Sequence, residues 1–260
     1  MAPTIPTPET PAAPDVKSHW IPLEANPEVL NAFTAKLGVI GYSWVDVYGL
    51  DPELLAMVPS GAIAIVLLFP VTPKYEEYRA QEHARLFAST STPATPAAAA
   101  AGMYIPQTIG NACGTMAVLH AVLNNTHKPG VLMHGSLLHT LHTDLGALAV
   151  PADRAAYLDK GKGHMLVGEA HGEVAVMGQS ATPDAEDDVD LHFVAFVAKG
   201  DDEAVVEFDG RKAGPVVHEA KGLRPVSEHL LDNVVHVVKE FMARDPENIQ
   251  FTLMALVPEA

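Results

Sequence analysis

The single cysteine of the chain, Cys113, has the residue type and the setting of a nucleophile. It follows Gly110-Asn111-Ala112 and precedes an apolar run that predicts a helix. Its sulfur is therefore expected near unpaired backbone N–H groups and the positive end of the helix dipole. Such an environment lowers a thiol pKa from about 8.5 and favours the reactive thiolate. A buried structural cysteine is the alternative interpretation, because position alone does not separate the two.

A histidine and an aspartate occur in two β-rich runs, 191–197 and 204–208, which we interpret as a hairpin. A two-residue turn at Gly200-Asp201 would place His192 directly opposite Asp209. Opposed Cβ atoms are about 4.5–5.5 Å apart, so the carboxylate could accept a hydrogen bond from the imidazole. A histidine alone in a strand would be interpreted as an ordinary core or surface residue. The pairing with Asp209 favours a Cys-His-Asp arrangement.

Gln107 lies in the loop before the Cys113 helix, next to a proline. Its primary amide can donate a hydrogen bond to a developing oxyanion without changing charge. Taken alone, a loop glutamine is more often a solvated side chain. Only its place beside Cys113 makes it a candidate.

The elements that must position these residues follow from hydrophobic spacing and helix-start signals. Asn26-Pro27-Glu28 predicts a helix that ends near Gly38, and the continuous apolar run 61–69 predicts a fully buried central strand. Further elements are a strand in 42–48, helices beginning at Pro52 and Pro73, a fully apolar helix 114–125, a helix around 153–158, an amphipathic helix through Leu230 and Met242, and a strand 251–257.

Three segments lack these patterns. Residues 1–16 predict a disordered tail, and residues 89–101, rich in Ser, Thr, Pro and Ala, predict a linker or mobile loop. The glycine-rich stretch 160–190 with its acidic cluster is interpreted as a long exposed loop. Loops of that length are usually functional or disordered, so a lid or binding element is expected, with a simple insertion as the alternative.

Composition excludes several classes of function. The formal net charge of −16 disfavours nucleic acid as a partner and favours basic protein surfaces, although it could serve solubility alone. One cysteine excludes an internal disulfide framework and fits the cytosol or nucleus. No secretory signal and no membrane span are expected, because the longest apolar run is far shorter than about 20 residues. His134, His139 and His142 are interpreted as surface histidines, so neither metal nor cofactor is expected.

Three separated motifs contain the candidate site residues: Gln107-Thr108-Ile109-Gly110-Asn111-Ala112-Cys113-Gly114-Thr115, Leu191-His192-Phe193-Val194-Ala195 and Glu207-Phe208-Asp209-Gly210-Arg211-Lys212. Together, and in this order, they resemble the signatures of the small ubiquitin C-terminal hydrolases. The stretches 20–28 and 45–55 also resemble that family, so the likeness covers nearly the whole chain from Trp20.

This resemblance implies a single catalytic domain over residues 17–260 with a papain-like α/β (α+β) fold. In that fold a central, mostly antiparallel sheet is flanked by helices and the backbone is knotted. It also implies that residues 160–179 form a crossover loop that limits adduct size, and that the loop's many small residues and the 89–101 segment depart from the usual pattern.

By the same resemblance the chain is a cysteine-type deubiquitinase acting at the last glycine of ubiquitin. Cys113 corresponds to the nucleophile, His192 to the general base, Asp209 to the residue that orients the histidine and Gln107 to the oxyanion-hole donor. Acidity would suit the arginines in the tail of ubiquitin, or of Nedd8 as a second candidate substrate. No cofactor is implied.

Two other functions stay open at this stage. A catalytically idle ubiquitin-binding module would be expected to lack one of the four site residues, and a one-cysteine peroxide sensor would depend on Cys113 alone. A monomer is expected, since no heptad pattern predicts assembly.

Overall fold

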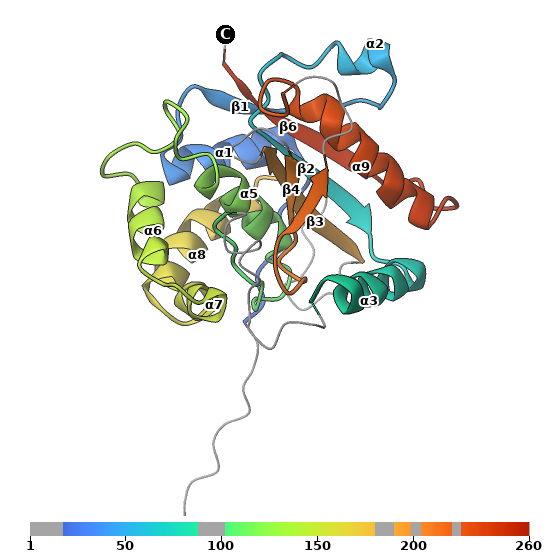
Figure 1. Cartoon of the computed structure of the whole chain (residues 1–260). Helices are drawn as coiled ribbons and strands as arrows, with labels where there is room; N and C mark the ends of the chain where they lie inside the picture. Colours follow the sequence, from blue (N-terminus) through green and yellow to red (C-terminus); the bar gives the residue numbers. More distant parts are fainter. Residues whose placement is uncertain (1–17, 88–101, 180–189, 199–203, 220–224, 260) are drawn as a thin grey trace, which may run out of the picture.

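The computed structural model describes residues 18–87, 102–179, 190–198, 204–219 and 225–259 (Figure 1). The helices are α1 (Pro27–Leu37), α2 (Pro52–Leu55), α3 (Pro73–Phe87), α5 (Cys113–Leu123), α6 (Leu137–Gly146), α7 (Pro151–Asp159), α8 (Lys162–Ala175) and α9 (Leu230–Arg244). The strands are β1 (Tyr42–Asp46), β2 (Ala64–Pro70), β3 (Leu191–Ala198), β4 (Ala204–Phe208), β5 (Val216–Glu219) and β6 (Thr252–Pro258).

These strands form one antiparallel sheet in the order β1-β6-β2-β3-β4-β5. Figure 1 shows α1, α5, α6, α7 and α8 on one side of it and α3 and α9 on the other. The α/β fold with an antiparallel sheet is therefore confirmed.

Both faces of the sheet are buried, because side chains alternate along each strand. In β2, Ala64 and Val66 belong to the core on the α5 side, whereas Ile65, Leu67 and Phe69 belong to the core on the α9 side. This arrangement explains the continuous apolar run of β2 and confirms the predicted central strand.

Local signals in the sequence fix the helix that leads into β1. The Asn26 side chain accepts a hydrogen bond from the Glu28 N–H, Pro27 occupies the first turn, and Gly38 ends the helix with a φ of 88°. Every residue of α5 is buried, as its apolar composition predicts.

The predicted exposed loop over 160–190 is wrong in its first half, where α8 extends from Lys162 to Ala175. Glycines lower helix propensity, but Gly163, Val167, Ala170 and Val174 recur at helical spacing and are all buried. Tertiary packing of this face outweighs propensity. The crossover loop expected over residues 160–179 therefore overlaps α8, and residues 180–189 lie outside the described residues.

The hairpin of β3 and β4 is confirmed, but its register differs from the expected one by two residues. Ala195 pairs with Phe208 and Phe196 with Glu207, so Asp209 is not directly opposite His192. A shift of two keeps each side chain on its own face, and the two residues remain diagonal neighbours at one end of the hairpin.

The tail 1–16, the segment 89–101 and the turn at Gly200-Asp201 lie outside the described residues. Within the described part of the chain, no helix is long and apolar enough to cross a membrane.

Two glycines of α8 test whether this segment is a helix in solution. Gly172 is exposed and has open space around it, so Gly172→Ala should raise the free energy of unfolding by about 0.5–1 kcal/mol through better helix propensity. In Gly163→Ala the new Cβ would lie 2.4 Å from the Tyr157 ring, so this variant should be destabilised. Thermal unfolding measures both, and equal effects of the two substitutions would argue against the helix.

Candidate active site

The site lies where the beginning of β3 meets the end of β4. His192 is the second residue of β3, and Asp209 directly follows β4. Nε2 of His192 donates to Oδ1 of Asp209 across 2.7 Å, and both side chains are buried. Cys113 is the first residue of α5, and its thiol forms a hydrogen bond with His192. The structure therefore brings together the three residues that the sequence suggested.

The start of α5 places the Cys113 sulfur next to free backbone donors. Asn111 has a φ of 58°, a left-handed conformation that asparagine tolerates, and Ala112 offers no capping side chain. The N–H groups of Phe193 and Gly114 consequently interact with the thiol. Gly114 must stay small, because a Cβ there would lie 3.1 Å from Leu23.

Asp209 is held in one orientation by its other oxygen and by the backbone. Its Oδ1 also accepts from the N–H of Arg211 at 2.8 Å, and its Oδ2 accepts from the Tyr75 hydroxyl at 3.1 Å. With Nε2 of His192 fixed by this carboxylate, Nδ1 is the ring atom available to Cys113. A carboxylate with this many donors stays ionised and fixes the ring.

The proton equilibria of the three residues are linked. Burial alone raises the pKa of Cys113, but hydrogen bonding to His192 and the imidazolium charge outweigh burial and hold that pKa below its ordinary value. Burial lowers the pKa of His192, yet the charge and hydrogen bond of Asp209 raise it to about 9. Burial raises the pKa of Asp209, and the His192 and Lys212 charges bring it well below its usual range. The geometry thus favours a thiolate–imidazolium pair at neutral pH.

Gln107 is positioned by the turn that carries Asp209. Its backbone N–H donates to the Gly210 carbonyl at 2.8 Å, and its side-chain Nε2 donates to the Ile109 carbonyl at 3.0 Å. A Cβ on Gly210 would lie 2.8 Å from Gln107 Cβ, so this close approach requires glycine. Its Oε1 is buried and makes no hydrogen bond within the described residues. The amide is thus tied to the same loop as Cys113.

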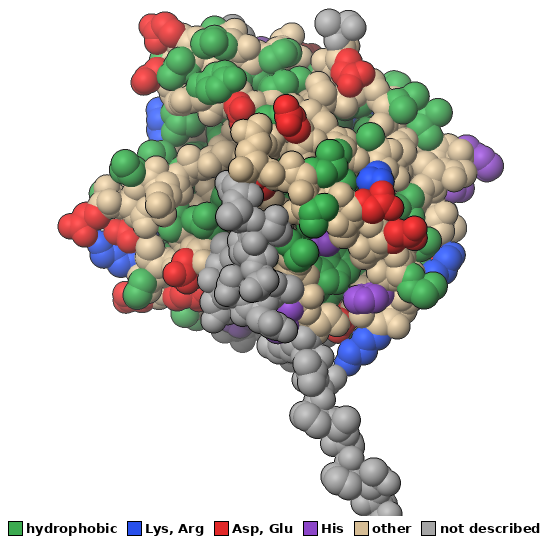
Figure 2. All heavy atoms as spheres, turned by 180° about the vertical axis from the view of Figure 1, so that it is seen from behind, with side chains coloured by type: hydrophobic (Ala, Val, Ile, Leu, Met, Phe, Trp, Pro, Cys, Tyr) green, Lys and Arg blue, Asp and Glu red, His purple; other side chains and the backbone are tan. Residues whose placement is uncertain are grey.

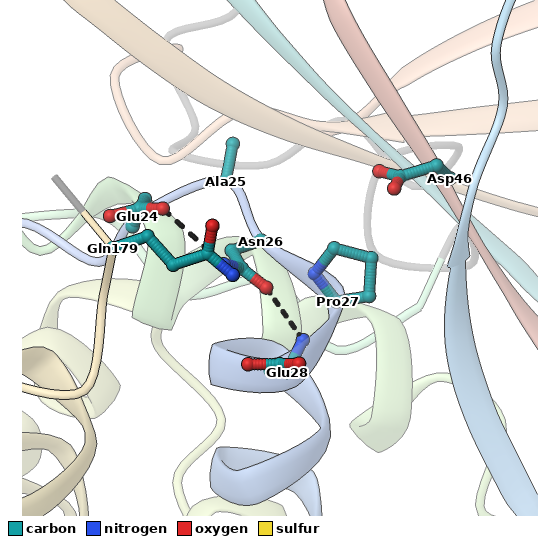
Figure 3. A pocket seen from close by; sticks show the side chains of 7 residues that line it. All are labelled: Glu24, Ala25, Asn26, Pro27, Glu28, Asp46 and Gln179. Atoms are coloured by element: carbon teal, nitrogen blue, oxygen red, sulfur yellow. Dashed lines mark hydrogen bonds between the residues drawn. The ribbon is translucent and has the colours of Figure 1, made fainter.

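An acidic pocket of about 400 Å³ opens at the start of α1. Figure 3 shows Glu24 and Glu28 from the α1 side and Asp46 from β1 around it. Glu24 follows Leu23, whose side chain packs beside Gly114. The chain segment that lines the pocket thus also contacts the first turn of α5 through Leu23.

No group of three or more His, Cys, Asp or Glu side chains that could hold a metal ion occurs in the described part of the chain.

The family model for ubiquitin carboxyl-terminal hydrolase, family 1, matches residues 20–243. The chain belongs to this family. It is a cysteine-type deubiquitinating hydrolase.

A ubiquitin carboxyl-terminal hydrolase of Aplysia californica is 39% identical over 238 residues, covering 89% of this hydrolase and 98% of the relative. The human isozyme L1 is 35% identical over 240 residues, covering 92% and 98%. The catalytic domain of Trichinella spiralis UCH37, solved bound to ubiquitin vinyl methyl ester, superposes with a TM-score of 0.68 at 19% identity, covering 94% of this hydrolase and 97% of that chain. The last comparison supports the fold.

Sequence reasoning did not find three residues that support the site of the hydrolase: Tyr75, His120 and Lys212. His120, in α5, accepts the N–H of Ile105 on Nε2 at 3.0 Å and stacks on Tyr104. It thereby holds the strand-like segment that leads to Gln107. Its position in a fully apolar helix was the available signal, since a polar residue there needs a partner.

His120 should make the hydrolase sensitive to acid. Burial lowers the pKa of His120 to about 4, whereas an unfolded histidine has a pKa near 6.5. Between these pH values the unfolded state binds more protons than the folded state. The contribution of neutral, buried His120 to the free energy of unfolding is therefore complete above pH 6.5 and is lost as pH falls to about 4. The loss amounts to about 3 kcal/mol.

Urea unfolding at several pH values, compared with His120→Gln, measures this contribution. The glutamine cannot titrate, so the stability difference between the two proteins should shrink as pH decreases. A difference that stays constant from pH 7 to pH 4.5 would contradict the assignment.

Proposed function

We propose that this hydrolase cleaves small adducts or peptide extensions from the C-terminal glycine of ubiquitin through an acyl-enzyme on Cys113. The observation that supports this most directly is the 2.7 Å hydrogen bond from His192 to the buried Asp209, with the thiol of Cys113 on the other side of the ring. An idle binding module would not need this alignment.

In the proposed reaction the Cys113 thiolate attacks the carbonyl carbon of the terminal glycine, and a tetrahedral oxyanion forms. The Gln107 amide and the backbone N–H of Cys113 are the donors for that oxyanion. Protonated His192 gives its proton to the leaving amine or thiol, which departs and leaves a thioester. The histidine then takes a proton from water, whose oxygen attacks the thioester and releases ubiquitin. Asp209 keeps the ring oriented throughout.

The acidic pocket is the proposed site for arginines of the ubiquitin tail. Carboxylates of Glu24, Glu28 and Asp46 line it, and the chain segment that lines it also contacts the first turn of α5 through Leu23. A tail that reaches Cys113 with its last residue would pass this pocket with the preceding ones. Asp and Glu side chains are also spread over the face shown in Figure 2, which favours approach of a basic partner. Nedd8 is a second candidate substrate on the same grounds of charge.

Release of a fluorophore from the C-terminus of ubiquitin tests the proposed activity. The wild-type protein should turn over, and Cys113→Ala should lose essentially all turnover because the nucleophile is gone. The Nedd8 conjugate run alongside ranks the two modifiers. A folded protein that binds ubiquitin without releasing the fluorophore would disprove the hydrolytic role of this site.

The acidic pocket is tested by Asp46→Asn, which removes one charge at almost constant volume. We expect KM for the ubiquitin substrate to rise roughly three- to tenfold with kcat little changed, and the difference to shrink at high salt. Glu247→Gln, the same charge change at an exposed position near the end of α9, is the matched control and should leave KM unchanged. A fall in kcat at constant KM would contradict a binding role.

A further inference from the structure

A buried cluster of charges is centred on Lys212, three residues after Asp209. Nζ of Lys212 is 2.5 Å from Oε2 of Glu82, on α3, and 2.5 Å from Oε1 of Glu207, on β4. The other oxygen of Glu207 accepts from Nε2 of His218, on β5, at 2.8 Å. Helix α3, strands β4 and β5 and the turn after β4 therefore contribute to one ionic network.

The members of this network are far more buried than charged residues normally are. Glu207 and Asp209 are 0% exposed, Glu82 is 4% exposed and Lys212 is 8% exposed. Taking charges out of water is expensive, and a buried ion pair is weak evidence for a stabilising role. A role in the chemistry of the adjacent site is a better explanation.

The backbone ties Lys212 to Asp209. The N–H of Lys212 donates to the Asp209 carbonyl at 3.0 Å, and the Tyr104 hydroxyl contacts the carbonyls of both residues. Lys212 and Asp209 thus belong to one tight turn. A change in the charge balance at Lys212 acts on the carboxylate that orients His192.

We propose that Lys212 is a positioning residue of the active site, and that its ammonium group, balanced by Glu82, sets the pH range in which Cys113 is a thiolate. This inference rests on the roles of Cys113, His192 and Asp209 proposed above. The Lys212 charge lowers the pKa of Asp209, which agrees with this role.

Several other groups face the same cluster. Tyr75 from α3 donates to Asp209, Arg244 from α9 lies over the Phe241 ring that also faces Lys212, and Arg211 pairs with Glu76. The further ionisable groups around Asp209 and Glu207 include His192, His120, His218, Tyr104 and, from α3, Arg79. All of these residues are retained in the variants below.

The sign of the effect follows from electrostatics. Removing the positive charge of Lys212 disfavours a nearby anion, so the pH at which Cys113 becomes a thiolate should rise. Removing the negative charge of Glu82 should lower it. A shift on the order of half a pH unit is expected for one charge that does not touch the thiol directly.

Alkylation by iodoacetamide measures this directly, because Cys113 is the only cysteine of the chain. The thiolate sulfur displaces iodide and forms an S–C bond, so the rate follows the thiolate fraction. The rate is measured against pH for wild type, Lys212→Met, Glu82→Gln and the double variant.

We expect the inflection of the rate–pH profile to move to higher pH in Lys212→Met and to lower pH in Glu82→Gln. In the double variant, which loses one charge of each sign, it should move back toward the wild-type pH. Lys36→Met, which removes the same charge from the exposed pair with Glu173, is the matched control and should not move it. Opposite shifts are a property of charge, whereas a merely structural role would lower activity without moving the inflection.

Unshifted inflections in folded variants, or shifts of the same sign in both single variants, would overturn the proposal. If Lys212→Met does not fold, Glu82→Gln alone tests the proposal. An unchanged inflection in the rate–pH profile of Glu82→Gln would contradict it. The alkylation needs no ubiquitin. Failure of ubiquitin hydrolysis would therefore disprove the proposed function separately from this inference.

Discussion

The hydrogen bond between His192 and Asp209 depends on the antiparallel pairing of β3 and β4. In such a pair the start of one strand lies beside the end of the next. Residues 17 positions apart in the sequence can therefore place their side chains in contact, with His192 Nε2 2.7 Å from Asp209 Oδ1. The remaining parts of the site are arranged around this contact. Cys113 approaches the ring from one layer, and Tyr75 approaches the carboxylate from the other.

Because the sheet is buried on both faces, side chains from both layers can reach the contact between His192 and Asp209. Cys113 belongs to the core on the α5 side, while Phe69 and Tyr75, which contact His192 and Asp209, belong to the core on the α9 side. The side chains of Cys113, His192 and Asp209 thus meet at the boundary between two cores, where water is largely excluded and hydrogen bonds to charged groups are strong. Cys113 is 9% exposed, which places the thiol at the edge of this buried region.

Local signals made much of this predictable. The caps of α1, the apolar run of β2 and the all-apolar α5 could each be predicted from adjacent residues. The three central residues of the site could be suggested from their types and their places in these elements. The hairpin register could not be obtained in the same way, because it depends on the whole connection between the strands. The helix α8 was missed because its glycines obscured a buried face that only tertiary packing reveals. Glu82 and Lys212 are 130 positions apart, so no local pattern indicates their contact.

The proposed recognition of a basic substrate tail and the proposed activation of the Cys113 thiol need opposite arrangements of negative charge. The carboxylates of Glu24 and Asp46 line the pocket at the start of α1, where solvent and a cationic ligand can reach them. Behind Asp209, the carboxylates of Glu82 and Glu207 are buried, and unpaired anions there would work against a nearby thiolate. The carboxylates of the pocket are partly open to solvent, whereas those of Glu82 and Glu207 are buried and need a resident cation. The placement of Lys212 in the turn that carries Asp209 meets this requirement within the chain itself.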